Sequence, residues 1–356
     1  MKVLVLGGTG SIGLPLVDLL TTKSVELDVY VSSRSPRKSK DNLTYLQGDA
    51  KDPFFLDSVL EGNDWDVIVD FMNYSTSEFT LRYQELLKST KHYVFISSAR
   101  VYADSNGAIT EDSPRLIDVS KDATYLSSDE YSLAKAKQEN LLFESCTKNW
   151  TIIRPYITYN DQRLQLGVLE KEDWLSRAML GKPICISKDI NEKLTTMTSG
   201  YDVARAITSL IGNKQSFGEA YHITSNKSVR WEEVAKLYAS EFELITGKKI
   251  TYILQSLDDV MKWHNGRYQV EYDRVLNRVF DNGKISKFID VDKFLPPEEG
   301  LKGCLKRCMK DPQLGMVSYR KQAIWDRQTK MMPSFLSSAS TKERLSYFYH
   351  RYLKNS

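Results

Sequence analysis

Short, strongly apolar runs recur through the first half of the chain. They cover residues 2–6, 27–31, 65–71 and 150–156, and a further run ends at Phe95 and Ile96. After the first of these runs, residues 14–20 carry apolar side chains at helical spacing. Runs of this length are typical of strands buried in a parallel sheet. The pattern therefore predicts an α/β protein that begins with a strand, a turn and a helix.

The turn between the first strand and the first helix is rich in glycine. In such a turn Gly7 permits a sharp change of direction, Gly10 lets the backbone approach a pyrophosphate, and Gly13 allows close packing of helix on strand. The helix N-terminus then faces the phosphates. An ordinary glycine-rich turn is the alternative, but the position between a buried strand and a helix favours a dinucleotide site. The cofactor contacts expected here are Gly7, Thr9, Gly10, Ser11, Ile12 and Gly13.

The second predicted strand bears on which dinucleotide is bound. A carboxylate at its end suits the ribose of NAD, whereas an arginine suits the extra phosphate of NADP. Arg34 stands there, followed by basic residues in 37–40 and no acid, which favours NADP. In the alternative, Arg34 stacks on adenine and the basic residues form a solvated loop, so the cofactor is NAD or NADP. Asp49 is expected to accept from the adenine amino group, with Asp52 as its competitor. Ala50 and Phe71 are further expected neighbours of the cofactor.

Tyr131 and Lys135 carry the candidate chemistry. Residues four apart in a helix lie on one face. Free tyrosine and lysine have pKa values of about 10 and 10.4, but a nearby ammonium favours phenolate and lowers the tyrosine pKa. Tyr131 then serves as acid or base, Ser98 bonds the same substrate oxygen, and Lys135 also reaches the nicotinamide ribose. Solvated helices carry the same spacing, but the order of glycine motif, serine and Tyr/Lys helix favours catalysis.

These motifs, with Gly48-Asp49, residues 97–102 and Arg154-Pro155, resemble the extended short-chain dehydrogenase/reductase superfamily, in its nucleotide-sugar epimerase/dehydratase branch. The resemblance implies a doubly wound Rossmann parallel sheet with a smaller C-terminal α/β substrate lobe. It implies Ser98, Tyr131 and Lys135 as the catalytic set, places the Arg154-Pro155 turn beside the nicotinamide, and makes Tyr156 an expected neighbour of the cofactor or the substrate. The family usually has Pro before the tyrosine and Ser before the lysine. Here Glu130 and Ala134 stand there, so the chain is an atypical member.

A departure from the family pattern narrows the reaction. Its sugar dehydratases carry Asp-Glu directly after the catalytic residue, whereas this chain has Ala99-Arg100. Alanine transfers no proton and arginine stays protonated, which argues against dehydration. The fucose-synthase type of member has a catalytic cysteine at the position of Ala99, so its reaction is also not expected here. We therefore expect NAD(P)-dependent epimerisation of a nucleoside-diphosphate sugar through a transient keto sugar. NADPH-dependent reduction of a keto sugar nucleotide is the alternative, and a non-catalytic dinucleotide-binding or RNA-associated protein is the alternative of another class.

Three regions are expected along the chain. Residues 1–160, joined by segments near 195–225, form the Rossmann domain; residues 161–316 form mainly the substrate lobe; residues 317–356 form an aromatic and basic helical extension. Arg274 or Arg278 is expected to bind the substrate diphosphate, with a solvated basic helix as the alternative. The extension covers the substrate lobe or makes a homodimer contact, and adhesion to a membrane surface is the weaker expectation.

Composition places few further limits on function. With 356 residues, 41% hydrophobic residues and a net charge of +3, the chain is typical of soluble proteins and has no basic tail for nucleic acid. No apolar run approaches the roughly 20 residues that span a bilayer, and no signal-like segment opens the chain. We therefore expect a cytoplasmic protein with reduced cysteines, no metal, no membrane association and no nucleic-acid partner.

Overall fold

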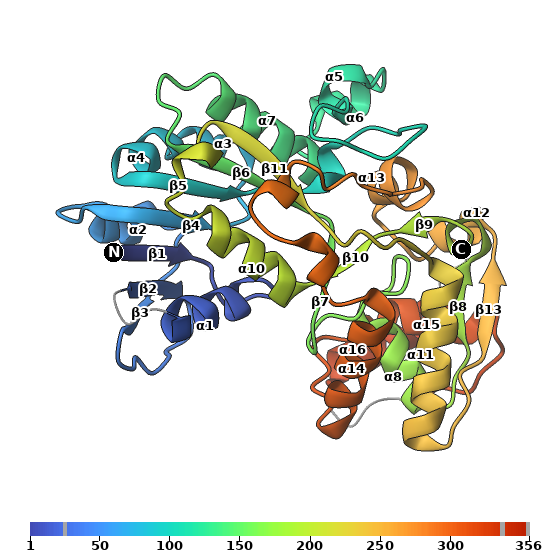
Figure 1. Cartoon of the computed structure of the whole chain (residues 1–356). Helices are drawn as coiled ribbons and strands as arrows, with labels where there is room; N and C mark the ends of the chain where they lie inside the picture. Colours follow the sequence, from blue (N-terminus) through green and yellow to red (C-terminus); the bar gives the residue numbers. More distant parts are fainter. Residues whose placement is uncertain (24–26, 335–338, 354–356) are drawn as a thin grey trace. The chain divides into compact units, whose positions relative to one another are not determined.

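The computed structural model describes residues 1–23, 27–334 and 339–353, and the chain divides into two compact units (Figure 1). Unit 1 comprises Met1–Thr158, Thr196–Asn226 and Val279–Leu295. Unit 2 comprises Tyr159–Thr195, Lys227–Arg278 and Pro296–Ser356. Each unit is therefore assembled from three separate stretches of the chain.

Unit 1 is built on a seven-stranded sheet in which every pairing is parallel. Its strands are β1 (Lys2–Leu6), β2 (Asp28–Ser33), β3 (Leu43–Gln47), β4 (Trp65–Asp70), β5 (Thr90–Ile96), β6 (Trp150–Pro155) and β11 (Glu219–Ile223). Their spatial order is β11-β6-β5-β4-β1-β2-β3, which extends the 3-2-1-4-5-6 order of dinucleotide-binding sheets by one strand. The doubly wound Rossmann fold expected from the sequence is confirmed. The order reverses between β1 and β4, and ligands of such sheets bind outside the strand ends at that point.

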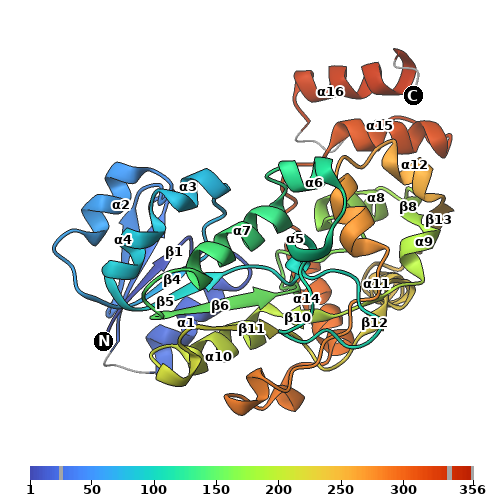
Figure 2. The ribbon, with the colours of Figure 1, turned by 90° about the horizontal axis from the view of Figure 1, so that it is seen from above.

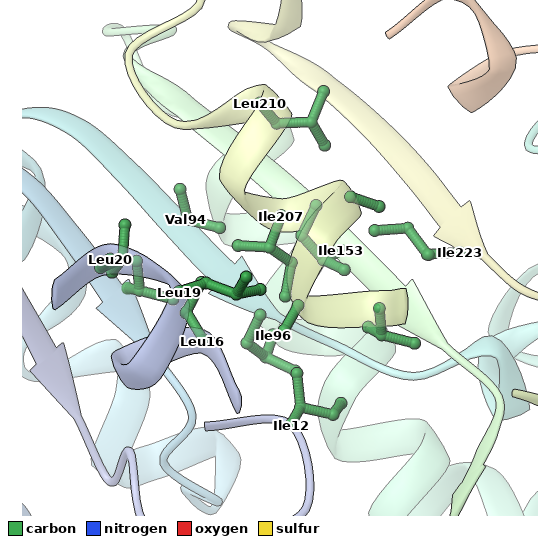
Figure 3. Packing of buried hydrophobic residues seen from close by; sticks show 14 of the residues in the cluster. Ile12, Leu16, Leu19, Leu20, Val94, Ile96, Ile153, Ile207, Leu210 and Ile223 are labelled. Carbon is green, nitrogen blue, oxygen red and sulfur yellow. The ribbon is translucent and has the colours of Figure 1, made fainter. Parts of the chain in front are cut away.

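Both faces of the sheet are covered by apolar side chains. In β1, Val3 and Val5 face one layer while Leu4 and Leu6 face the other. Figure 3 shows part of the first layer, which packs under α1 (Gly13–Lys23) and α10 (Gly200–Leu210). The second layer packs under α2 (Pro53–Leu60), α3 (Thr76–Thr80), α4 (Tyr83–Lys88) and α7 (Tyr131–Phe143). Burial on both faces explains why the strands read as uninterrupted apolar runs.

Shorter elements complete unit 1. Strand β7 (Ile157–Tyr159) has its first two residues in unit 1 and Tyr159 in unit 2. The other short elements are η1 (Ala99–Val101), α5 (Leu116–Val119), α6 (Ala123–Ser127), β10 (Met197–Ser199), η2 (Lys214–Ser216), η4 (Ile285–Lys287) and η5 (Val291–Lys293). The last two belong to a segment that the sequence analysis assigned to the substrate lobe. In the structure Ile285, Val291 and Phe294 pack into the first apolar layer. The segment has no long helix or strand, so no regular apolar pattern in the sequence indicated where it packs.

Unit 2 combines helices with two small sheets. Its strands are β8 (Ile184–Ser187), β9 (Leu194–Thr195), β12 (Val229–Arg230) and β13 (Tyr252–Gln255). Its helices are α8 (Lys171–Met179), α9 (Lys188–Asn191), α11 (Trp231–Thr246), α12 (Leu257–Met261), α13 (Arg267–Gln269), η3 (Val270–Arg274), α14 (Pro297–Lys310), α15 (Tyr319–Gln328), α16 (Thr341–Phe348) and η6 (Tyr349–Leu353). Strand β8 pairs in parallel with β13, and β9 pairs antiparallel with β12. The ring of Trp174 stacks on Tyr238 at 4.6 Å between centroids, within the core of this unit.

The C-terminal helices are part of unit 2. Helices α15 and α16 lie side by side in Figure 2. Asp326 of α15 is fully buried and binds Arg177 at 2.8 Å, Lys182, and the hydroxyl of Tyr347 at 2.6 Å. A carboxylate buried among three donors fixes the helices to the rest of the unit. Among the described helices, none combines the length and the apolar character that crossing a membrane requires.

Candidate active site

The glycine-rich turn joins the carboxyl end of β1 to the start of α1. Gly7 has a φ of +70°, a left-handed conformation that glycine adopts without strain. Its N–H donates to Ser32 Oγ at 3.0 Å, which ties the turn to the end of β2. Thr9 N–H donates to Gly7 O at 2.9 Å, and Leu14 N–H donates to Gly10 O at 3.0 Å. The turn is thus held in one conformation immediately before the helix.

The three glycines of the motif differ in what surrounds them. A Cβ on Gly13 would lie 2.6 Å from the carbonyl carbon of Gly8, so the helix packs on the turn only without a side chain there. A Cβ on Gly10 would meet no protein atom within 4 Å. Open space beside a helix N-terminus, whose first amides have no partner within the helix, fits the pyrophosphate of a dinucleotide. The residues present therefore fit the cofactor that the motif predicts.

The residues expected around the adenosine end follow neighbouring strands. Arg34 follows β2 and is exposed, and Asp49 follows β3 and is exposed. Gly48 N–H donates to Ser33 O at 3.0 Å, which places these two strand ends beside each other. Asp49 Oδ1 accepts the N–H of Lys51 at 2.9 Å, so the carboxylate is oriented by its own turn. Their roles toward adenine or a ribose phosphate stay predictions.

The other predicted cofactor neighbours are buried or partly buried. Ala50 is buried at 2% exposure and packs with the second apolar layer, and Ile12 is buried in the first. Phe71 extends β4 by donating its N–H to Leu6 O at 2.9 Å. Tyr156 is buried, with its ring 5.3 Å from that of Phe280.

Ser11 is tied to another strand of unit 1. Its hydroxyl lies 3.2 Å from Oγ1 of Thr158, the middle residue of β7, which links that strand to the glycine-rich turn. The glycine turn is therefore connected directly to the strand that follows the Arg154-Pro155 motif.

Lys135 lies in the interior of unit 1 although it is a charged residue. Its side chain is 3% exposed, and Nζ donates to Met72 O at 3.2 Å and to Ile96 O at 2.9 Å. Met72 lies in the segment that follows β4, and Ile96 is the last residue of β5. An ammonium has three donors, so the two carbonyls leave one for a further acceptor.

Burial changes the acid–base behaviour of this lysine. Desolvation lowers the pKa of Lys135 to about 8, while the negative charges of Asp70 and Glu139 act against that shift. The positive charge of Lys51 adds to the lowering. A lysine with a pKa close to neutrality changes its charge in the range where a proton-transferring enzyme works.

Tyr131 begins helix α7, one turn before Lys135. Its side chain is 37% exposed, in contrast to the buried lysine. The guanidinium of Arg100 lies 5.4 Å from the centre of the Tyr131 ring and is itself fixed by Glu130 at 2.8 Å. Ser98 accepts the N–H of Arg100 at 3.2 Å, so Arg100 links Ser98 with Tyr131. From the sequence, Arg100 served only as evidence against a dehydratase. No sequence pattern indicated that its guanidinium packs on the Tyr131 ring.

A buried ionic network lies behind the site. Glu139 of α7 accepts hydrogen bonds from Nε and Nη2 of Arg154, each at 2.8 Å, and from the hydroxyl of Ser97 at 2.6 Å. Arg154 also donates to Tyr102 Oη at 2.9 Å. The network joins α7 to the ends of β5 and β6, and the Ser97 side chain is part of it. The Ser98 side chain instead caps the N-terminus of η1. In the sequence Arg154 is recognisable only as part of a motif, and no local pattern indicates the role of Glu139.

The two arginines expected to bind a diphosphate are buried in unit 2. Arg274 is 3% exposed, donates to Gly167 O at 3.1 Å and pairs with Asp273. Arg278 is fully buried and pairs with the other oxygen of Asp273 at 3.0 Å. The alternative of a solvated basic helix is wrong, because both side chains are buried and share the carboxylate of Asp273. Binding of a diphosphate by either residue stays a prediction.

The fold is shared with several nucleotide-sugar enzymes of known structure. Similar structures include the dTDP-glucose 4,6-dehydratase of Bacillus anthracis in complex with NAD, with 19% identity and a TM-score of 0.66 over 87% of this chain and 97% of the other. The UDP-glucuronic acid 4-epimerase of Bacillus cereus in complex with UDP-glucuronic acid and NAD has 18% identity and a TM-score of 0.64 over 86% of this chain and 99% of its own. The UDP-glucose 4-epimerase of Bifidobacterium longum has 18% identity and a TM-score of 0.64 over 88% and 100%. At these identities the likeness establishes the fold, as the resemblance to extended short-chain dehydrogenases/reductases predicted.

One sequence relative has a different kind of name. The chloroplast stem-loop binding protein of 41 kDa b from Arabidopsis thaliana is 28% identical over 253 residues, which cover 67% of this chain and 62% of the relative. This chain therefore aligns with less than two thirds of that protein. A family model described as NAD(P)H-binding matches residues 7–214, more than half of the chain and including the glycine turn, Ser98, Tyr131 and Lys135. The chain belongs to the NAD(P)H-binding family, and its cofactor is a nicotinamide dinucleotide.

Proposed function

We propose that the protein is an NAD(P)-dependent epimerase of a nucleoside-diphosphate sugar. The observation that carries the proposal is the buried ammonium of Lys135, held by two backbone carbonyls one helical turn from the partly exposed Tyr131. A structural lysine at this depth would be expected to pair with a carboxylate, as Lys182 does with Asp326. The similarity to nucleotide-sugar epimerases supports the substrate class.

The residues of this chain have distinct roles in the proposed reaction. The turn at Gly7 and Gly10 binds the dinucleotide, which supplies reversible hydride transfer when bound. Tyr131 takes the proton from a sugar hydroxyl as the carbon is oxidised and returns it to the oxygen after the keto sugar has turned over. Ser98 donates to the same oxygen. Lys135 binds the cofactor ribose and so fixes its position relative to the Tyr131 side chain. Hydride returns to the opposite face of the sugar, so no net oxidation occurs.

The test uses Tyr131→Phe and the matched control Tyr201→Phe. Tyr201 is 47% exposed in the first turn of α10, and its substitution removes a comparable hydroxyl away from the site. Both proteins are incubated with NAD and a panel of nucleoside-diphosphate sugars, and products are separated by anion-exchange chromatography. We expect Tyr131→Phe to lose turnover while it still binds NADH, and Tyr201→Phe to retain both. Near-normal turnover by Tyr131→Phe would contradict the proposal.

A ketoreductase would use the same residues with a different outcome. Arg34 after β2, without an acid in its place, is compatible with NADP. Sustained loss of NADPH absorbance with a keto sugar nucleotide would identify a reductase. Internal recycling of tightly held NAD, without net change in absorbance, would identify an epimerase.

Stem-loop binding is the second candidate, because the Arabidopsis relative carries that name. The net charge of +3 gives only a weak general attraction to nucleic acid, so specific binding would require a defined surface. Titration of a labelled RNA stem-loop at physiological salt tests it, with an unstructured RNA of equal length as the control. Submicromolar binding that prefers the stem-loop would favour this function over catalysis.

A further inference from the structure

Asp70 is a buried acid for which the proposed reaction has no role. It ends β4, is fully buried, and lies in the centre of the sheet, where β4 runs between β1 and β5. Its Oδ1 accepts the N–H of Met72 at 2.8 Å, and its Oδ2 accepts the hydroxyl of Tyr93 at 2.8 Å. Both oxygens thus face donors, an arrangement that favours the charged carboxylate.

The segment that Asp70 holds is also held by Lys135. Asp70 binds the N–H of Met72, and Lys135 binds the carbonyl of the same residue at 3.2 Å. Met72 also borders the glycine-rich turn, since a Cβ on Gly7 would lie 2.8 Å from Met72 Sδ. One residue therefore connects the buried acid, the buried lysine and the start of the dinucleotide site.

We propose that Asp70 is a positioning residue of the dinucleotide site, whose carboxylate fixes Met72 and through it the ammonium of Lys135. The inference rests on the proposed function, because it assigns Asp70 a role through the lysine that is proposed to bind the cofactor ribose. Asp70 acts through Met72 and Lys135 and is not itself placed against cofactor or substrate.

Charge adds to this geometric coupling. The charged groups that act on Lys135 are Asp70 from β4, Glu139 from its own helix, and Lys51, and the two acids together counteract the effect of burial on its pKa. Asp70 in turn has a pKa raised by burial and held down by Met72 N–H, the Tyr93 hydroxyl and the charge of Lys135, with a smaller contribution from Tyr74. Neutralising Asp70 removes one of the two charges that keep Lys135 protonated, so the lysine loses its proton at a lower pH.

The test compares Asp70→Asn with Asp66→Asn in direct binding of NADH between pH 6.5 and 9.5. Asp66 lies on the same strand but pairs with Lys91 at 2.7 Å near the surface, so its substitution makes the same change of charge away from the site. We expect Asp70→Asn to weaken NADH binding about tenfold at pH 7, as for loss of a hydrogen bond to a charged group, and to move the alkaline loss of binding to lower pH. Asp66→Asn should match the wild type in both respects.

Other outcomes separate this inference from the proposed function. If the wild type binds NADH and Asp70→Asn follows its affinity and pH profile, the positioning role is overturned while the proposed function stands. If the wild type binds neither NADH nor NADPH, both are overturned.

A second variant covers the case in which Asp70→Asn does not fold. Tyr93→Phe keeps the carboxylate and removes one of its two donors. It should weaken NADH binding several-fold in the same pH-dependent manner, and an unchanged affinity would overturn the positioning role.

Discussion

The stability of a Lys135→Met variant, measured relative to the wild type, should be higher at neutral pH than at alkaline pH. Burial lowers the pKa of Lys135 from 10.5 to about 8, so the charged lysine is less favourable in the folded protein than in the unfolded chain. At about 1.4 kcal/mol per unit, this difference amounts to about 3 kcal/mol at neutral pH, which is an upper value. Methionine fills the same space without a charge.

The sign of the pH dependence follows from proton counting. Between pH 8 and 10.5 the unfolded chain keeps the proton on Lys135 while the folded protein has released it, so wild-type stability rises with pH. Urea unfolding of wild type and Lys135→Met across this range should show the wild type gaining up to about 3 kcal/mol relative to the variant. The variant should also lose NADH affinity, because it lacks the Lys135 ammonium that is proposed to bind the cofactor ribose.

Lys91→Met is the matched control for this experiment. Lys91 is fully exposed, and its hydrogen bond to Asp66 raises its pKa, so any linkage has the opposite sign. Its stability relative to the wild type should not fall between pH 8 and 10.5. If the stability of the wild type relative to Lys135→Met stays flat or falls as pH rises, Lys135 does not carry the desolvation cost inferred from its burial.

Three further substitutions address the glycine turn and the C-terminal helices. Gly10→Ala should fold with unchanged stability, because its Cβ meets no protein atom within 4 Å, yet bind NADH less tightly; a normal affinity would remove Gly10 from the pyrophosphate site. Gly13→Ala should lower the urea midpoint, since its Cβ would lie 2.6 Å from the backbone of Gly8, and an unchanged midpoint would show that the helix can shift. Asp326→Asn should destabilise the protein by about 3–5 kcal/mol by leaving buried cations underpaired, as measured by urea unfolding; a loss below about 1 kcal/mol would show that Arg177 and its neighbours find other partners.

Local features of the site could be predicted from the sequence. The glycine turn depends on backbone conformation and close approach, which act within a few residues, and the positive φ of Gly7 agrees with that interpretation. The spacing of Tyr131 and Lys135 likewise depends only on helix geometry, and both lie in α7 as expected. The order of apolar runs was sufficient to expect the parallel sheet.

Long-range partners could not be predicted in this way. The carbonyls that hold Lys135 belong to residues 63 and 39 positions earlier, and no local pattern indicates such pairs. The same is true of Glu139 and Arg154, whose pairing depends on where α7 packs against β6. For Arg274 a signal was present, because Asp273 directly before it supplies the neutralising charge.

The way unit 1 is assembled has a consequence for synthesis of the protein. Strand β11 pairs with β6, and residues 279–295 complete the layer under α1 and α10. A ribosome that has released residues 1–158 has therefore made a sheet whose last strand, β6, still has an unpaired edge. That edge is covered only after the first stretch of unit 2 and then β11 have been translated, so a nascent chain has to protect it from aggregation for more than sixty residues. Fragments cut at the end of β6 should for the same reason be poorly soluble, and the dinucleotide-binding unit is best expressed as part of the whole chain.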